Sequence, residues 1–425
     1  QVRYSDGSSG TLWDHLKLAF QHQELQLGPH GGYLTGATGD WSDFATQFLQ
    51  MTESTLVSAQ TAYVYPRLAE LADARGDHAF AAALRGSGAR DLATERREWT
   101  GKGWYSRGYS GERQIGSGAV FGEPQPWALL AGAPSASQAA KVVANVRRFL
   151  TGVGAPPEVH GPAQIGSSQS PASNDPDVTE RSNPPRTIGG NGAVYVGGTW
   201  FAVNGWLTWA LASLDGVVPH AADYALDEFA RNTLAAHANA FPNHWDGILS
   251  VDDVCNSFHA TDDPAKCGNG LSTSYEGQIM HQPAWSLYDA TKLAGIQPTA
   301  AGYTFDPHLP SSRFSLRFPD VGVAYERRRA RGYVVLDRAA AGAISVSVRV
   351  PAGVRASAAV TWVNGRKAAH TRRGGLLTFR LAPPHAGAAA DWAVTRAPAV
   401  RRRVPRRPRP HRSRGHTHRA PDFTG

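Results

Sequence analysis

The order of apolar and polar residues divides the chain into a helical part and a β part. Up to about residue 300, apolar residues recur every three or four positions, which is typical of helices that bury one face. From about residue 313 the period becomes two, as in "GYVVLDR" and "AISVSVRV", and this predicts strands. The pattern therefore predicts a mainly α protein with a C-terminal β domain.

The helical part should contain helices of similar length, joined by loops that are rich in glycine and proline. Pro66 should kink or split one of them, because proline lacks the N–H group that a helix interior needs. The expected helices are 11–23, 52–75, 77–100, 124–132, 136–151, 199–214, 220–238 and 281–295. The stretch 155–190 is rich in Pro, Ser and Asn and is too long for an ordinary connection.

The β part predicts a small antiparallel β-sandwich that ends near residue 397. Asn364-Gly365, between two alternating segments, is a strong signal for a hairpin turn. Helices of similar length followed by such a sandwich are typical of an α-barrel or helical toroid with an added β domain. We expect a helical domain at 1–310, a β-sandwich at 311–397 and a tail at 398–425.

The net positive charge of the chain equals that of this tail. The formal net charge is +8, and nine of the 43 Lys and Arg residues but one of the 35 Asp and Glu residues lie in 400–425, which leaves 34 of each sign elsewhere. The tail alternates Arg with Pro and has little apolar surface to bury, so we expect it to be disordered. Nucleic acid is therefore not the expected partner.

The compartment stays open on sequence grounds. A disulfide between Cys255 and Cys267 would suit an exported protein, whereas two free thiols fit equally well and would allow a cytoplasmic one. No apolar run approaches the roughly 20 residues that span a bilayer. No signal peptide is visible, and the first residues already lead into an amphipathic helix. We therefore expect the sequence to begin partway through a larger protein.

The segment "GPHGGYLTGATGDWSDF", residues 28–44, carries the first candidate chemistry. Its glycines let the backbone turn tightly and approach a ligand. A carboxylic acid such as Asp43 can protonate a leaving oxygen if burial or a neighbouring charge such as Asp40 raises its pKa. Trp41 would supply an apolar wall or a stacking face. The alternative is that Asp40 or Asp43 only caps the following helix.

This region resembles the cellobiose and chitobiose phosphorylases, family 94 of the glycoside hydrolases. In that family a helix with Asp-His leads through Gly-Pro-His-Gly to a loop that ends in Asp-Trp-Asn-Asp, and here Ser42 replaces the Asn. The resemblance implies that Asp43 is the general acid and that Trp41 lines the sugar site. It also implies an (α/α)6 barrel, of which this chain lacks the N-terminal part.

Three further segments resemble the family in the same order. "FGEPQPWALLAG" matches at Gln125 and Trp127, "GNGAVYVGGTW" matches at Tyr195, and "MHQPAWSLYDATKLAGIQP" is similar to the last barrel helix and the exit into the β domain. The resemblance makes these residues candidates for substrate binding. His281 and Gln282, which begin this last segment, are candidates for binding sugar, water or an anion.

The departures from the family favour hydrolysis slightly over phosphorolysis. Val196-Gly197 stands where the family has Thr-His, and Met280-His281 stands where it has a phosphate-binding Thr-Gly. An inverting hydrolase instead needs a second carboxylate, about 6.5–9.5 Å from the acid, to activate water. Glu276 is the preferred base. Glu123 and the pair Asp252 and Asp253 are the other candidates.

The remaining candidates keep two interpretations each. His244 and Trp245 in "FPNHWDGI" would line a sugar subsite or be buried as core residues. Glu123 would bind a sugar hydroxyl or orient a neighbour. The acidic residues between 252 and 263 could collect Ca²⁺, but their spacing fits no EF-hand, so a solvated loop is preferred. No metal or organic cofactor is implied.

These observations predict a carbohydrate-active enzyme that cleaves a glycosidic bond, most readily a β-linked one, with inversion. The expected partners are an oligosaccharide or β-glucoside, with inorganic phosphate as the co-substrate if the enzyme is a phosphorylase; a homodimer is compatible. The alternatives are an inverting glycoside phosphorylase, which could use His281 to bind phosphate, and a sugar-binding module with a degenerate site.

Overall fold

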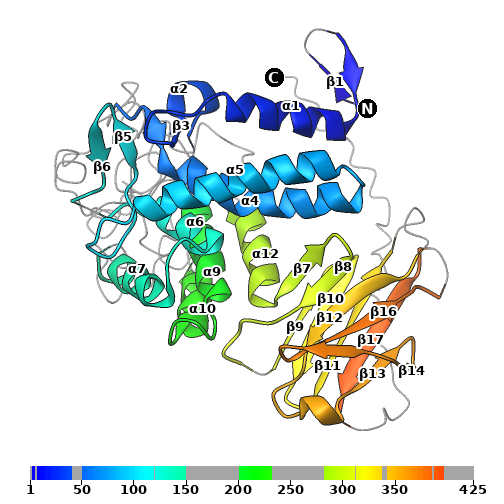
Figure 1. Ribbon diagram of the computed structural model, residues 1–425. Coiled ribbons are helices and arrows are strands. Elements are labelled where there is room, and N and C mark those ends of the chain that lie inside the picture. The colour runs from blue at the N-terminus through cyan, green and yellow to red at the C-terminus, as the bar shows by residue number, and fades with distance from the viewer. Residues whose placement is uncertain are drawn as a thin grey trace, which may run out of the picture. The chain divides into compact units, whose positions relative to one another are not determined.

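The computed structural model describes residues 2–4, 7–40, 50–118, 120–149, 201–231, 282–311, 313–336, 342–384 and 387–396. The chain divides into two compact units. The first comprises Gln1–Leu293 and His308–Pro310, and the second comprises Ala294–Pro307 and Ser311–Gly425. The first unit is mainly helical and the second is built of strands (Figure 1), which confirms the predicted helical part and C-terminal β domain.

The helices of the first unit lie close to the predicted ranges. They are α1 (Leu12–Glu24), α2 (Thr35–Thr38), α4 (Thr55–Ala74), α5 (His78–Arg97), α6 (Pro124–Ala131), α7 (Ala136–Phe149), α9 (Phe201–Ser213), α10 (Ala221–Arg231) and α12 (Gln282–Leu293). Side chains define several of their starts: Thr11 and Asp14 form a capping box at α1, and Ser54 accepts from the backbone N–H of Val57 at α4. Within the described residues, no helix is both long and apolar enough to cross a membrane.

Pro66 does not split the second long helix. Helix α4 runs through Thr55–Ala74 with Pro66 inside it. The neighbouring helix α5 has Gly88 at this point, where an added Cβ atom would lie 3.1 Å from Cδ of Pro66 and 3.3 Å from Cβ of Tyr65. The two helices therefore approach closely beside the proline, and this packing holds the helix together across it.

Four helices of the first unit contact one another in series, with their N-terminal turns together. Helix α4 contacts α6, α6 contacts α9, and α9 contacts α12, while α5, α7 and α10 each follow one of the first three (Figure 1). One hydrophobic cluster joins the beginnings of all four helices: Leu56 and Ala59 from α4, Trp127 from α6, Val203, Trp206 and Trp209 from α9, and Trp285 from α12. The four helices are therefore parallel, and their N-termini lie at a common end.

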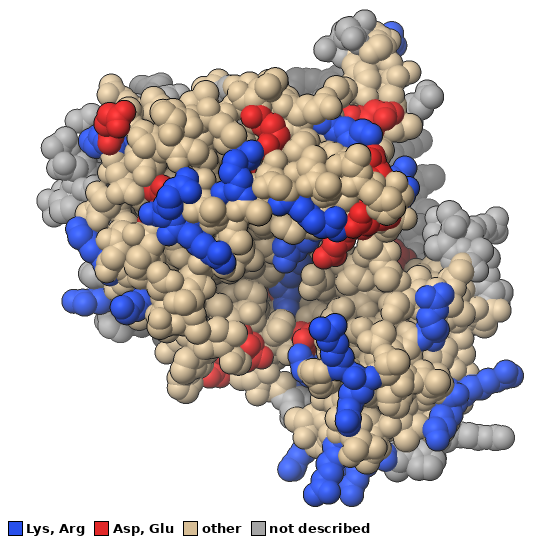
Figure 2. All heavy atoms as spheres, in the orientation of Figure 1, with Lys and Arg blue, Asp and Glu red and all other residues tan. Residues whose placement is uncertain are grey.

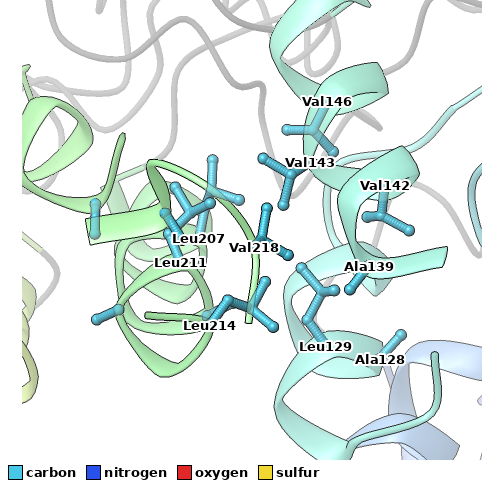
Figure 3. Packing of buried hydrophobic residues seen from close by; sticks show 14 of the residues in the cluster. Ala128, Leu129, Ala139, Val142, Val143, Val146, Leu207, Leu211, Leu214 and Val218 are labelled. Atoms are coloured by element: carbon cyan, nitrogen blue, oxygen red, sulfur yellow. The ribbon is translucent and has the colours of Figure 1, made fainter. Parts of the chain in front are cut away.

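The largest core of this unit lies between α6, α7, α9 and α10. Val143 and Val146 of α7 lie toward Leu207 and Leu211 of α9, and Val218 lies between the two helices (Figure 3). These apolar positions recur every three or four residues, as the sequence pattern predicts. Burying such side chains stabilises the fold by about 1.5–3 kcal/mol each, which fixes the helices that present the candidate site.

Short strands connect the helices of the first unit. They are β1 (Val2–Arg3), β2 (Ser9–Gly10), β3 (Tyr33–Leu34), β4 (Glu53–Ser54), β5 (Gly108–Ser110) and β6 (Arg113–Ile115). The last four form one antiparallel sheet in the order β3-β4-β5-β6. This sheet joins the glycine-rich segment before α4 to the chain that precedes α6.

The second unit consists of two sheets that share one hydrophobic core. Its strands are β7 (Ile296–Thr299), β8 (Gly302–Phe305), β9 (Phe314–Arg317), β10 (Val321–Glu326), β11 (Arg329–Val335), β12 (Ile344–Arg349), β13 (Val360–Val363), β14 (Arg366–Ala368), β15 (Thr371–Arg373), β16 (Leu376–Leu381) and β17 (Ala389–Thr395). The sheet orders are β14-β13-β17-β11-β10-β9 and β15-β16-β12-β8-β7. Phe305 and Phe379 of the second sheet contact Trp392 of the first in the shared core.

The predicted hairpin at Asn364-Gly365 is confirmed. Strands β13 and β14 pair on either side of it, and both residues have positive φ angles, 47° and 78°. The predicted boundary at residue 310 differs from that of the compact units, because β7 and β8 already belong to the β unit. These strands carry Pro298 and little alternation, so the sequence pattern does not reveal them.

Gly295 should be essential for the entry into the β unit. Its φ angle is +65°, and an added Cβ atom would lie 1.8 Å from the backbone oxygen of Asp306. Gly295→Ala should therefore destabilise the protein by at least about 1–3 kcal/mol in urea unfolding. Gly342→Ala is the control, because an added Cβ atom there meets nothing within 4 Å. Equal stability of the two variants would contradict this close approach.

Candidate active site

The glycines of residues 28–32 wrap around a buried carboxylate. Glu53, on β4, accepts hydrogen bonds at Oε2 from the backbone N–H groups of His30 (3.1 Å) and Gly32 (3.2 Å). Its Oε1 atom lies 2.7 Å from Nδ1 of His30. A Cβ atom at Gly28 would lie 2.2 Å from the carboxyl carbon of Glu53. Only glycine fits there, so the glycines serve a tight turn around Glu53.

His30 connects this turn to the neighbouring strand. Its ring stacks on Tyr109 of β5 with centroids 3.9 Å apart and planes 1° apart. Glu53 and, less strongly, Glu112 raise the pKa of His30 above its usual value. Contacts with Glu53 of β4 and Tyr109 of β5 therefore fix the glycine-rich segment before the chain reaches Asp40.

Asp40 is anchored by a buried arginine. Arg107, directly before β5, donates from Nη2 to Oδ1 of Asp40 (2.5 Å) and from Nη1 to Oδ2 (3.0 Å). Ser54 also donates to Asp40 from the N-cap of α4. The side chains of Asp40 and Arg107 are fully buried. A two-pronged arginine–carboxylate contact fixes both position and orientation, so it sets the point from which the chain continues to Trp41 and Asp43.

Glu123 lies on the other side of Arg107. It is the N-cap residue of α6, is fully buried, and places Oε2 at 3.9 Å from Nε of Arg107. Neither of its carboxyl oxygens has a hydrogen-bond partner among the described residues. Burial raises the pKa of Glu123 to about 8, Arg107 opposes this rise, and the charge of Asp40 adds to it. Glu123 therefore holds a proton at neutral pH.

The raised pKa of Glu123 predicts a pH-dependent stability. The folded protein holds a proton that the unfolded chain releases above a pKa of about 4.5, so the free energy of unfolding should fall between about pH 4.5 and 8. Glu123→Gln should remove this loss. Between pH 5 and 9 the free energy of unfolding of the variant should rise by a few kcal/mol relative to that of the wild type, as measured by urea unfolding. Glu70→Gln, at an exposed position of α4, is the control. Parallel pH curves for wild type and Glu123→Gln would contradict the raised pKa.

Gln125 and Trp127 lie on α6 just beyond Glu123. The amide of Gln125 is buried; its Oε1 accepts from the backbone N–H of Tyr105 (2.9 Å), and its Nε2 donates to the carbonyls of Tyr105 and Phe121. Trp127 packs edge-to-face against Trp206 and Trp209 of α9. In the described structure Gln125 orders the chain around it, and Trp127 joins the aromatic cluster at the helix N-termini.

Most other candidates fall outside the described residues. These are Trp41, Asp43, Tyr195, His244, Trp245, Glu276 and His281, together with Asp252, Asp253, Cys255 and Cys267. Gln282 is the first residue of α12, and its side chain is not among those described. Their positions in the chain are still informative, because Asp43 precedes α4, Tyr195 precedes α9, and Glu276 precedes α12.

Sequence reasoning missed several buried charged groups of the helical unit. Arg107 and Glu53 stand in segments without a recognisable motif, and only the fold brings them to the candidate loop. On α12, Asp289 is fully buried and burial raises its pKa well above the usual value. Lys292, on the same helix, lies over the rings of Trp209 (4.5 Å) and Tyr288 (4.4 Å), and burial lowers its pKa to about 8. Among the described residues, no group of three His, Cys, Asp or Glu could hold a metal ion.

Comparison with known families gives a match over the first part of the chain. Residues 1–157 match the glycosyl hydrolase 94 superfamily, catalytic domain. This match covers 157 of the 425 residues of the chain. The match includes α1, the glycine-rich segment, Arg107 and Glu123.

Comparison with solved structures gives distant matches. One, described as a glycoside hydrolase, has 10% sequence identity and a TM-score of 0.25, and the alignment covers 64% of this chain and 46% of the other. Another, a GH127 β-L-arabinofuranosidase from Geobacillus stearothermophilus T6, has 12% sequence identity and a TM-score of 0.23. This alignment covers 90% of this chain and 68% of the other. The chain spans less than half of the first of these proteins. Curated protein sequences give no match.

Proposed function

We propose that the chain cleaves a glycosidic bond with inversion of configuration, and that Asp43 is its general acid. Asp43 would protonate the glycosidic oxygen as the bond to the anomeric carbon breaks. Water would attack that carbon from the opposite face and lose its proton to a second carboxylate. The products are a free sugar and an alcohol. The substrate would be an oligosaccharide or a β-linked glucoside.

One observation carries this proposal: the candidate residues precede the N-termini of helices that start at a common end. Asp43 stands 12 residues before Thr55, where α4 begins, and Glu123 occupies the N-cap position of α6. Tyr195 stands six residues before Phe201, the start of α9, and Glu276 stands six residues before Gln282, the start of α12. Since a chain reaches at most about 3.5 Å per residue, the arrangement of α4, α6, α9 and α12 supports one shared site.

The helix order also supports an (α/α)6 barrel as the architecture of this domain. In such a barrel, inner helices run parallel and each is followed by an outer helix that returns the chain. The inner helices would be α4, α6, α9 and α12, and the outer helices would be α5, α7 and α10. We propose that the helical unit, Gln1–Leu293 with His308–Pro310, forms this catalytic domain, and that the second unit, which includes β7 and β8, forms a β-sandwich.

The anchoring of Asp40 supports the role of Asp43. Asp40 is fixed by Arg107 and Ser54, so Asp43 starts three residues from a rigid point, within about 10 Å of it. An acid needs such positioning, because proton transfer requires hydrogen-bond distance to the leaving oxygen. Trp41, between the two, would form the sugar-stacking wall.

We propose hydrolysis as the reaction and Glu276 as the base. Glu123 is protonated near neutral pH and is enclosed behind Arg107, so it is poorly suited to accept a proton from water. Arg107 is bound to Asp40, which leaves it unsuited to hold phosphate. His281, directly before α12, favours phosphorolysis as the second candidate, because an imidazolium there would bind an inorganic phosphate.

Phosphate dependence separates the two reactions. The protein would be incubated with β-linked gluco-oligosaccharides, with and without inorganic phosphate, and both reducing sugar and sugar 1-phosphate would be measured. Hydrolysis predicts reducing sugar in both mixtures and no sugar 1-phosphate. Formation of sugar 1-phosphate only when phosphate is present would replace hydrolysis by phosphorolysis. No product in either mixture, over a panel of β-linked glycans, would overturn the enzymatic proposal.

A further inference from the structure

The β unit is strongly basic even without the tail. Its described cations are Arg313, Arg317, Arg327, Arg328, Arg329, Arg331, Arg349, Arg355, Arg366, Lys367, Arg372, Arg373, Arg380 and Arg396, and its described anions are Asp306, Asp320, Glu326 and Asp391. Figure 2 shows Lys and Arg spread over this unit, with almost no Asp or Glu on the face that is turned to the viewer. Before the tail the chain has equal numbers of positive and negative residues, but the positive ones are concentrated in the β unit. This excess of positive charge favours a polyanionic partner for the unit.

One row of residues crosses the outer face of the six-stranded sheet. The strand pairings place Ser315 beside Ala324, Ala324 beside Arg331, Arg331 beside Ala393, Ala393 beside Trp362, and Trp362 beside Lys367. The alternate residues Val334, Trp392 and Val394 lie in the core on the other face. Since neighbouring strands are about 4.8 Å apart, the row spans about 24 Å.

The side chains of this row combine a flat surface with an aromatic plane and cations. Ser315, Ala324 and Ala393 are small and leave a shallow floor. Trp362 is half-buried, and its ring is held by a hydrogen bond from Nε1 to Oγ1 of Thr395 (3.3 Å). Lys367 is exposed beside it at the edge of the sheet. Aromatic planes of this kind stack on flat ligand faces, and the cations attract negative charge.

We propose that this row binds an acidic polysaccharide, with a sugar ring stacked on Trp362 and a carboxylate or sulfate group at Lys367. The choice of a glycan among polyanions rests on the proposed function, whereas the surface does not depend on the catalytic residues. A membrane is disfavoured because the described β unit has no exposed large hydrophobic side chain to insert. Single-stranded nucleic acid is disfavoured because its binding uses several stacking aromatics.

The test compares binding by full-length variants. Affinity for polygalacturonate would be measured by affinity electrophoresis, with a neutral β-glucan, double-stranded DNA and anionic lipid vesicles as the other ligands. Trp362→Ala should weaken polygalacturonate binding about tenfold and Trp362→Phe should restore most of it. Lys367→Gln should weaken it about two- to fivefold. Arg380→Gln, which removes the same charge from an exposed position on the other sheet, should have little effect.

The outcomes are distinct. Equal losses for Lys367→Gln and Arg380→Gln, with no effect of Trp362→Ala, would overturn the proposal in favour of non-specific attraction. Binding to DNA or vesicles that equals polygalacturonate binding and is likewise weakened by Trp362→Ala would also overturn it, in favour of another polyanion. Turnover of a small soluble β-glucoside should be unchanged in Trp362→Ala. Failure of the catalytic proposal would instead appear as absent turnover while the binding differences remain.

Discussion

Asp43→Asn should lower turnover by about 10²–10⁴-fold while leaving the affinity for substrate almost unchanged. The amide has nearly the same shape as the carboxylic acid, but it has no acidic proton to give to the leaving oxygen, and general acid catalysis contributes about this factor. The measurement is kcat and KM on a β-linked gluco-oligosaccharide, together with binding of the same sugar by calorimetry.

Two comparisons make this result specific to Asp43. Asp320→Asn, at an exposed position of the β unit, should leave kcat unchanged. An aryl glucoside with a good leaving group should be less affected by Asp43→Asn, because such a group departs without protonation. A variant that keeps more than about a tenth of the wild-type kcat on the oligosaccharide would exclude Asp43 as the general acid.

Arg107→Gln should destabilise the helical unit by about 3–5 kcal/mol. The substitution leaves Asp40 buried without its two-pronged partner. Unfolding in urea at pH 7, followed by tryptophan fluorescence, measures the loss. Arg113→Gln, at an exposed position of the adjacent strand β6, should cost less than about 1 kcal/mol.

A double variant tests whether the loss comes from the contact with Asp40. Asp40→Asn combined with Arg107→Gln should be less destabilising than the sum of the two single changes, because neither side chain is then left as an isolated buried charge. Additive losses would show that Arg107 stabilises the protein through other contacts. Activity should fall in Arg107→Gln even at temperatures where the protein stays folded, because Asp43 loses its fixed starting point.

Local patterns explain which parts of the fold could be predicted. The long helices bury one face, so their apolar residues recur with the helical period, and the turn at Asn364-Gly365 needs the positive φ angles that these two residues accept easily. Strands β7 and β8 were not predicted, because both are short and β7 carries a proline. The continuity of α4 through Pro66 depends on close packing by Gly88, which is distant in sequence.

The candidate site was predictable only where a motif lies within one segment. Asp40, Trp41 and Asp43 stand together in a segment that resembles a known family. Arg107, by contrast, lies 67 residues from the aspartate that it binds. Glu53 looks like an ordinary surface residue until the turn of residues 28–32 closes around it. Contacts of this kind depend on tertiary structure, which a single sequence does not display.

The shared direction of α4, α6, α9 and α12 has an electrostatic consequence. Each helix carries a partial positive charge of roughly half a unit at its N-terminus, from peptide dipoles that add along its axis. Four such ends close together create a positive potential without any lysine or arginine side chain. This potential would stabilise the ionised form of Asp40 and of a carboxylate base at this end of the unit. The backbone itself would therefore favour ionised carboxylates here.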